Sequence, residues 1–296
     1  MSSLTGAPMI KSILVPATGT ETDLTSLTTA LTIARDFSAH IDALHVRLDA
    51  VDVAVSTASR QGGSLVEKLV QQLKQDAHER ELRARQTFED FCRRESLRLV
   101  EAPASEATAS PSAQWHVETG DEADTVASYG MLADLVICAR GPDKHFTTRL
   151  LLESALLNTG RPLLIPNARD TPANFAGGTM AIAWKPTLQA ARAVAAAMPL
   201  LACAKEIVVM TVGEEGPAAQ TDGLLRNLAW HGLRVRAQRL GSKERDPANT
   251  LLEAAGKTAS LLVMGGYGHS RIREWAFGGF TRQVLADAPL PVLMAH

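Results

Sequence analysis

The stretch from Leu261 to His296, LLVMGGYGHSRIREWAFGGFTRQVLADAPLPVLMAH, decides the fold of this chain. It opens with four apolar residues, LLVM, which are short in extent, flanked by glycine and typical of a fully buried parallel strand. Gly265, Gly266 and Gly268 follow, and a helical pattern resumes from Phe280 to Ala286. Two prolines then precede a last apolar strand. This order of strand, glycine-rich turn, helix and strand indicates a parallel α/β sheet.

The glycines after the first of these strands suit an anion-binding turn. Glycine lets the backbone approach a ligand without interference from a Cβ atom, and the free N–H groups of a helix start favour negative charge. Gly278 and Gly279 can open another helix and present a second set of N–H groups. Two sets that face each other would hold a polyphosphate. Because strand-to-helix turns also use glycine for steric reasons alone, both interpretations stay open.

The same order of elements occurs twice along the chain, which is the mark of an internal repeat. Strands are predicted at residues 10–16, 41–48, 114–118, 133–139 and 163–165, and again at 180–184, 206–212, 233–240, 260–264 and 292–294. With helices between them, they predict an α/β fold of two tandem, doubly wound, parallel five-stranded sheets with helices on both faces. We expect a first domain at residues 8–167, a linker at 168–178 and a second domain at 179–296.

Two helices of the first half can be placed from local pattern. Asp23 or Thr22 is expected to cap the helix after the first strand. A long amphipathic helix, inserted in the first domain, is predicted from Leu65 to Arg94. Its charged residues are interpreted as a solvated face. They are Lys68, Lys74, Glu79, Arg83, Arg85 and Glu89.

Composition argues against several classes of function. The chain has 296 residues, is 46% hydrophobic and carries a net charge of −2, so it lacks the basic excess of a nucleic-acid binder. No apolar run is long enough to cross a membrane, and no signal peptide is recognised. The three cysteines, Cys92, Cys138 and Cys203, have no metal-ligand spacing. We therefore expect a cytoplasmic protein that binds neither nucleic acid nor membrane and has no metal site.

The pattern Gly265-x2-Gly268-x9-Gly278 resembles the nucleotide-binding signature of the universal stress protein family. The segments MGGYGHSR, GGFTR and PLPVLMAH are similar to segments in the C-terminal domains of tandem-domain members. In the first half, ILVPATGT and ADLVICA show a weaker resemblance to the family. The resemblance implies an adenine nucleotide α-hydrolase-like fold. It also implies association through last strands, so residues 161–166 and 291–296 are expected to pair within the chain as a pseudo-dimer. A further homodimer is left open.

The resemblance further implies an adenine nucleotide site in the second half. Its candidate residues are Lys185, Val212, Gly265, Gly266, Gly268, His269, Gly278, Gly279, Phe280 and Thr281. The acidic residue of ATP-binding members is replaced by Thr18 in the first half and by Lys185 in the second, and Gly279 stands where the signature has Ser or Thr. Lys185 is either a phosphate ligand or a solvated strand-end lysine. ATP-binding members also use a valine at the end of the second strand, which corresponds to Val46 in the first half and to Val212 in the second. The first half has this valine but lacks the glycine signature, so its nucleotide site is expected to be vestigial.

Three functions are compatible with these features. The first is a cytoplasmic stress-response sensor or regulator that binds ATP or a related nucleotide, with at most weak ATP hydrolysis, no assigned catalytic residue and the need for Mg²⁺ left open. The second is an interaction or scaffold protein of the same family that binds no nucleotide and acts through an unidentified protein partner. The third, ranked last, is an adenylating enzyme or ATP-pyrophosphatase of the wider fold. Such enzymes carry a Ser-Gly-Gly type loop, whereas this chain has PATGT and AWKPT.

Overall fold

The computed structural model describes residues 9–49, 63–102, 110–141, 146–167, 175–213, 218–241, 246–266 and 279–296. The first half contains β1 (Ser12–Pro16), α1 (Thr22–Phe37), β2 (His40–Arg47), α3 (Gly63–Arg94), β3 (Arg98–Leu99), β4 (Ser112–Thr119), α4 (Glu122–Gly130), β5 (Leu135–Ile137), α5 (Phe146–Asn158) and β6 (Leu163–Ile165). The second contains β7 (Thr179–Ala183), α6 (Leu188–Leu201), β8 (Glu206–Val212), α7 (Ala218–Trp230), β9 (Val235–Leu240), α8 (Pro247–Thr258), β10 (Leu261–Gly265), α9 (Gly279–Asp287) and β11 (Val292–Ala295).

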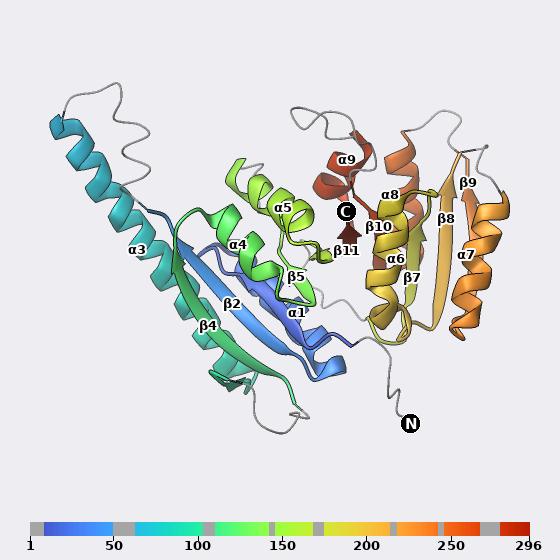
Figure 1. Cartoon of the computed structure of the whole chain (residues 1–296), viewed down its shortest axis with the longest axis horizontal. Coiled ribbons are helices and arrows are strands. Elements are labelled where there is room, and N and C mark those ends of the chain that lie inside the picture. The colour runs from blue at the N-terminus through green and yellow to red at the C-terminus, as the bar shows by residue number, and fades with distance from the viewer. Residues whose placement is uncertain are drawn as a thin grey trace.

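The strands of the described residues form one continuous sheet (Figure 1). Their order is β3-β4-β2-β1-β5-β6-β11-β10-β7-β8-β9. Neighbouring strands are parallel throughout each half, and only β6 and β11 are antiparallel. The predicted fold class of two tandem parallel α/β units is confirmed. The two sheets share one hydrogen-bonded ladder, and the two-residue strand β3 is an addition that the sequence did not predict.

Helices cover both faces of the sheet and produce two cores. Successive side chains of a strand point to opposite faces, so Ile13 and Val15 join one core while Leu14 joins the other. The first core packs against α1, α3, α6 and α7, and the second against α4, α5, α8 and α9. Because both faces are buried, the central strands are nearly continuous apolar runs, as expected for parallel strands.

The two halves are joined where β6 meets β11. Leu164 lies opposite Leu293 in the antiparallel register, and the two residues are 0% and 1% exposed. The predicted pairing of the last strands is therefore confirmed, within the chain. Because the two strands run in opposite directions, the carboxyl end of β6 lies at the same edge as the amino end of β11.

Helix α3 is much longer than its counterpart α7, with 32 residues against 13. Its large buried side chains, Phe88 and Phe91, belong to its carboxyl-terminal part, and no described residue between 67 and 80 is buried. The other part of α3 projects beyond the sheet (Figure 1). The segment that links these two parts lies over the end of β1.

Candidate functional site

The carboxyl ends of β7, β8 and β10 form the predicted nucleotide-binding edge of the second half. These strands are adjacent and parallel, so Lys185, Val212 and Gly265 come to one edge of the sheet. Lys185 is exposed and Val212 is half-buried. Three candidate residues, Gly268, His269 and Gly278, lie outside the described residues.

The start of α6 gives this edge a positive electrostatic character. Thr187 caps the helix, and its Oγ1 accepts a hydrogen bond from the N–H of Ala190 at 3.3 Å. The first turn contains no acidic side chain. The helix dipole therefore acts next to the exposed ammonium of Lys185 without a competing carboxylate from that turn. Such an arrangement suits a phosphate group.

Two glycines of the signature have a packing reason of their own. A Cβ atom added to Gly265 would lie 2.5 Å from the backbone nitrogen of Ala190, and one added to Gly266 would lie 2.8 Å from Cδ2 of the buried Leu156. Both distances are shorter than real Cβ atoms tolerate. Close approach of α6 thus gives Gly265 a packing role, and the side chain of Leu156 gives one to Gly266. Nucleotide binding by these two glycines stays a prediction.

The start of α9 differs from these two glycines. A Cβ atom added to Gly279 would meet no atom of the described residues within 4 Å, and the residue is exposed. Phe280 is half-buried against the second core, and Thr281 is 7% exposed. Gly279 is therefore the residue of this helix start that faces outward, and its lack of a side chain is not explained by packing against the described residues.

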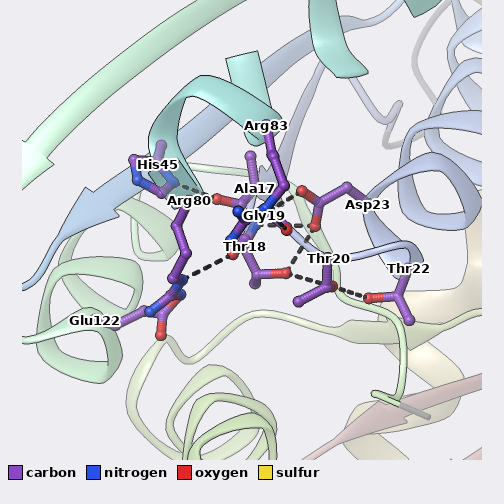
Figure 2. A network of polar contacts seen from close by, with 10 residues as sticks. All are labelled: Ala17, Thr18, Gly19, Thr20, Thr22, Asp23, His45, Arg80, Arg83 and Glu122. Atoms are coloured by element: carbon purple, nitrogen blue, oxygen red, sulfur yellow. Dashed lines mark hydrogen bonds and ion pairs between the residues drawn. The ribbon is translucent and has the colours of Figure 1, made fainter. Parts of the chain in front are cut away.

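The loop after β1 in the first half corresponds to the loop after β7 in the second half. The protein's own side chains form hydrogen bonds to it, as Figure 2 shows. Asp23 is 3% exposed, and its carboxylate accepts hydrogen bonds from the N–H of Thr18 at 2.9 Å, from Thr18 Oγ1 at 2.8 Å and from the N–H of Gly19 at 2.8 Å. Burial raises the pKa of Asp23 despite these bonds. The N–H groups that an anionic ligand would need after β1 are already paired with a carboxylate.

Helix α3 lies directly on that loop (Figure 2). Arg80 Nε donates to the carbonyl of Thr18 at 3.2 Å, and Arg83 Nε donates to the carbonyl of Gly19 at 3.4 Å. Arg80 also forms an ion pair with the buried Glu122, Nη2 to Oε1, at 3.6 Å. Burial raises the pKa of Glu122, while the charge of Arg80 opposes that shift. The strand-end position of the first half is therefore filled by α3.

The side chain of His45 also contacts the chain at the start of this loop, through the backbone of Ala17. It is 1% exposed, its Nδ1 lies 2.7 Å from the carbonyl oxygen of Ala17, and its ring stacks on Trp115 with centroids 6.1 Å apart. The short contact requires Nδ1 to carry the proton and donate it. Burial lowers the pKa of His45 below its ordinary value.

The lowered pKa of His45 predicts a dependence of stability on pH. Below about pH 6.5 the unfolded chain takes up a proton at this residue more readily than the folded chain. The stability that the neutral ring contributes is complete above that pH and is lost as the pH falls. Urea denaturation between about pH 7 and pH 5 should therefore show a smaller loss of unfolding free energy in His45→Gln than in the unmodified protein. His231→Gln, which changes an exposed histidine, should keep the original slope, and equal slopes in all three proteins would contradict the prediction.

Several of these contacts differ from the sequence interpretation. The capping prediction was wrong: α1 has Glu21 at its N-cap with no side-chain cap, and Asp23 turns back to the loop instead. Arg83, interpreted as part of a solvated face, donates to the first-half loop, and Arg80 was not singled out. Arg80 and Thr18 are 62 positions apart in the sequence, so no local sequence pattern predicts their contact.

Among the described residues there is neither a candidate metal-binding cluster nor a candidate membrane-spanning helix. Within the described ranges, no group of three or more His, Cys, Asp or Glu side chains is placed to hold a metal ion. None of the helices in these ranges combines the length and the hydropathy that a membrane span needs.

Comparisons with known proteins agree with this architecture. The model of the "Universal stress protein family" matches residues 9–156 and 185–296. A universal stress protein of Archaeoglobus fulgidus DSM 4304 superposes with a TM-score of 0.69 at 16% identity, covering 97% of this chain and 96% of that one. A putative universal stress protein of Pseudomonas aeruginosa UCBPP-PA14 gives 0.57 at 16% identity, covering 97% and 93%. No curated protein sequence matches the chain significantly. The two matches to the family model, which together span most of the sequence, show that the chain belongs to the universal stress protein family.

Proposed function

We propose that this tandem universal stress protein binds ATP or a related adenine nucleotide in its second half and acts in the cytoplasm as a stress-response sensor or regulator. The observation that carries the proposal is the contrast between the two strand-end edges. In the first half, α3 and Asp23 occupy the groups around the loop after β1. In the second half, the exposed Lys185 and the capped start of α6 lie at the corresponding edge. The counterpart of α3 there is the shorter helix α7, with 13 residues against 32.

The test begins with the protein as purified. It is denatured, any released nucleotide is identified by chromatography, and the stripped protein is titrated with ATP by calorimetry. We expect Lys185→Ala to weaken ATP binding about tenfold, because it removes a charged partner of the phosphates. Gly279→Val should weaken binding at least about tenfold, since its side chain enters space that the described residues leave open at a helix start.

The control variants separate binding from folding. Lys205→Ala removes an exposed lysine at the amino end of β8 rather than at its carboxyl end. Gly223→Val adds the same side chain within α7, where a Cβ atom also meets nothing within 4 Å. Both should bind ATP like the unmodified protein. Equal loss in the controls and the site variants, or no heat of binding in the unmodified protein, would contradict the proposal.

The alternative is an interaction protein of the same family that binds no nucleotide. It is favoured by one observation, the packing explanation of Gly265 and Gly266, because these glycines do not require a ligand. Gly265→Ala is accordingly a poor test of binding, since it is expected to disturb α6 whether or not a nucleotide is present. The Lys185 and Gly279 variants discriminate between the two functions because neither position is tightly packed in the structure.

A further inference from the structure

Arg140 is a residue of the first half whose side chain reaches into the second. It follows β5, at the position that corresponds to Gly266 after β10. Its Nη2 donates to the carbonyl of Ala288 at 3.2 Å, and its Nη1 lies 3.4 Å from the carbonyl of Ala286 as a second donor. The first acceptor follows the last residue of α9 directly, and the second lies in its last turn. The contact crosses the junction of the halves at the edge where the carboxyl ends of β5 and β6 meet the amino end of β11.

The two carbonyls are the kind of acceptor that a helix end leaves unsatisfied. The last four carbonyl groups of a helix have no partner within it, and a cation at this end also interacts favourably with the helix dipole. Arg140 supplies both effects. Its Nε is buried and has no hydrogen-bond partner among the described residues, so this nitrogen is withdrawn from water at a cost when the guanidinium reaches the two carbonyls.

The helix that Arg140 holds also carries the outward-facing glycine of the candidate site. α9 has nine residues, Gly279 to Asp287, and therefore spans about 13 Å. Val284 anchors its middle in the second core with no exposed surface, and Gln283 Nε2 donates to Asn249 Oδ1 of α8 at 2.8 Å. A short helix fixed along its length moves as a unit. The position of its carboxyl-terminal end thus helps to set where Gly279 and its N–H group lie.

We infer that Arg140 is a positioning residue through which the first half sets the phosphate affinity of the nucleotide site in the second half. The inference rests on the proposed function. In this arrangement the first half binds no nucleotide at its own strand-end edge. It instead orients α9, so that the N–H groups at the start of α9 stay aligned with the phosphate-binding edge beside α6.

The test compares two arginine variants by calorimetry with ATP and with adenosine. Arg140→Gln should weaken ATP binding about fivefold to tenfold and leave adenosine binding unchanged, because only the phosphates are inferred to contact the start of α9. Arg140→Lys keeps a cation at the helix end and should recover part of the loss. Arg161→Gln is the matched control. Its guanidinium also bonds a carbonyl at a helix end, that of Met131 after α4, at 3.1 and 2.9 Å, but entirely within the first half. It should bind ATP normally.

Hydrogen–deuterium exchange of the ligand-free proteins gives a second readout. Amides of α9 should exchange faster in Arg140→Gln than in the unmodified protein, while amides of α6 should not change. Normal ATP binding by Arg140→Gln, or the same loss in Arg161→Gln, would overturn the inference and leave the proposed function standing. Equal weakening of ATP and adenosine would also overturn it, because that result indicates general destabilisation. If the unmodified protein binds neither ligand, the proposed function fails and the inference fails with it.

Discussion

Replacing Gly19 by alanine is expected to lower the free energy of unfolding by about 3 kcal/mol. Gly19 has a φ of +74°, which an alanine adopts only with strain. The added Cβ would also lie 2.5 Å from the backbone carbonyl oxygen of Arg80, so α3 would have to move away from the loop after β1. Urea denaturation measures the loss directly. Shifted α3 amides in an NMR spectrum would identify where the strain is relieved.

Gly160→Ala is the matched control for this prediction. Gly160 has a similar φ of +65°, but a Cβ atom there meets nothing within 4 Å. It should therefore show only the backbone strain, about 1 kcal/mol. The difference between the two variants measures how tightly α3 is held on the first-half loop. Equal losses would show that α3 does not press on Gly19 and does not fill the position after β1.

Replacing Leu164 by aspartate should have the largest effect, a loss of at least about 4 kcal/mol in the free energy of unfolding. Leu164 is 0% exposed and pairs with Leu293 at the junction of the two halves. An aspartate there would place a carboxylate in an apolar core with no cation opposite it in the strand register. Thermal or urea unfolding followed by circular dichroism provides the measurement.

An exposed leucine on a strand serves as the comparison. Leu99 lies in β3 at one end of the sheet and is 56% exposed, so Leu99→Asp should change the free energy of unfolding by no more than about 0.5 kcal/mol. A small effect at Leu164 would mean that the β6–β11 junction contributes little to stability. The halves would then behave as independent domains on a tether.

The fold was predictable because its signals are local. Apolar runs such as Leu261–Met264, followed by glycine or by a helical pattern, identify most strands of both halves, and their repetition identifies the tandem architecture. Strand β3 escaped prediction because it has two exposed residues, Arg98 and Leu99, and no apolar pattern. The domain boundaries at residues 167 and 179 remain predictions.

The candidate site was less predictable, because its decisive contacts join distant parts of the chain. A glycine after a strand can be required by the close approach of a helix or by a bound ligand, and the sequence alone does not distinguish these two causes. The close approach of Ala190 gives Gly265 a packing role, and the described residues leave space open at Gly279, where a ligand role stays available. In the same way, the contacts of Arg80 and Arg140 depend on which helix the sheet brings beside them. All the candidate residues remain predictions for nucleotide binding, and Gly268, His269 and Gly278 lie outside the described residues.

The antiparallel junction of β6 and β11 has a consequence for assembly. Two such domains on separate chains would associate only at sufficient concentration and would exchange partners, whereas here a single polypeptide supplies both members at a high effective concentration that dilution does not change. The stoichiometry is fixed at one first half for each second half. In the part of the chain that the structure describes, the edge strands of the sheet are β3 and β9. Each second half is therefore always paired with the first half of the same chain. The first half can then be specialised for stabilising the second half, without a ligand site of its own.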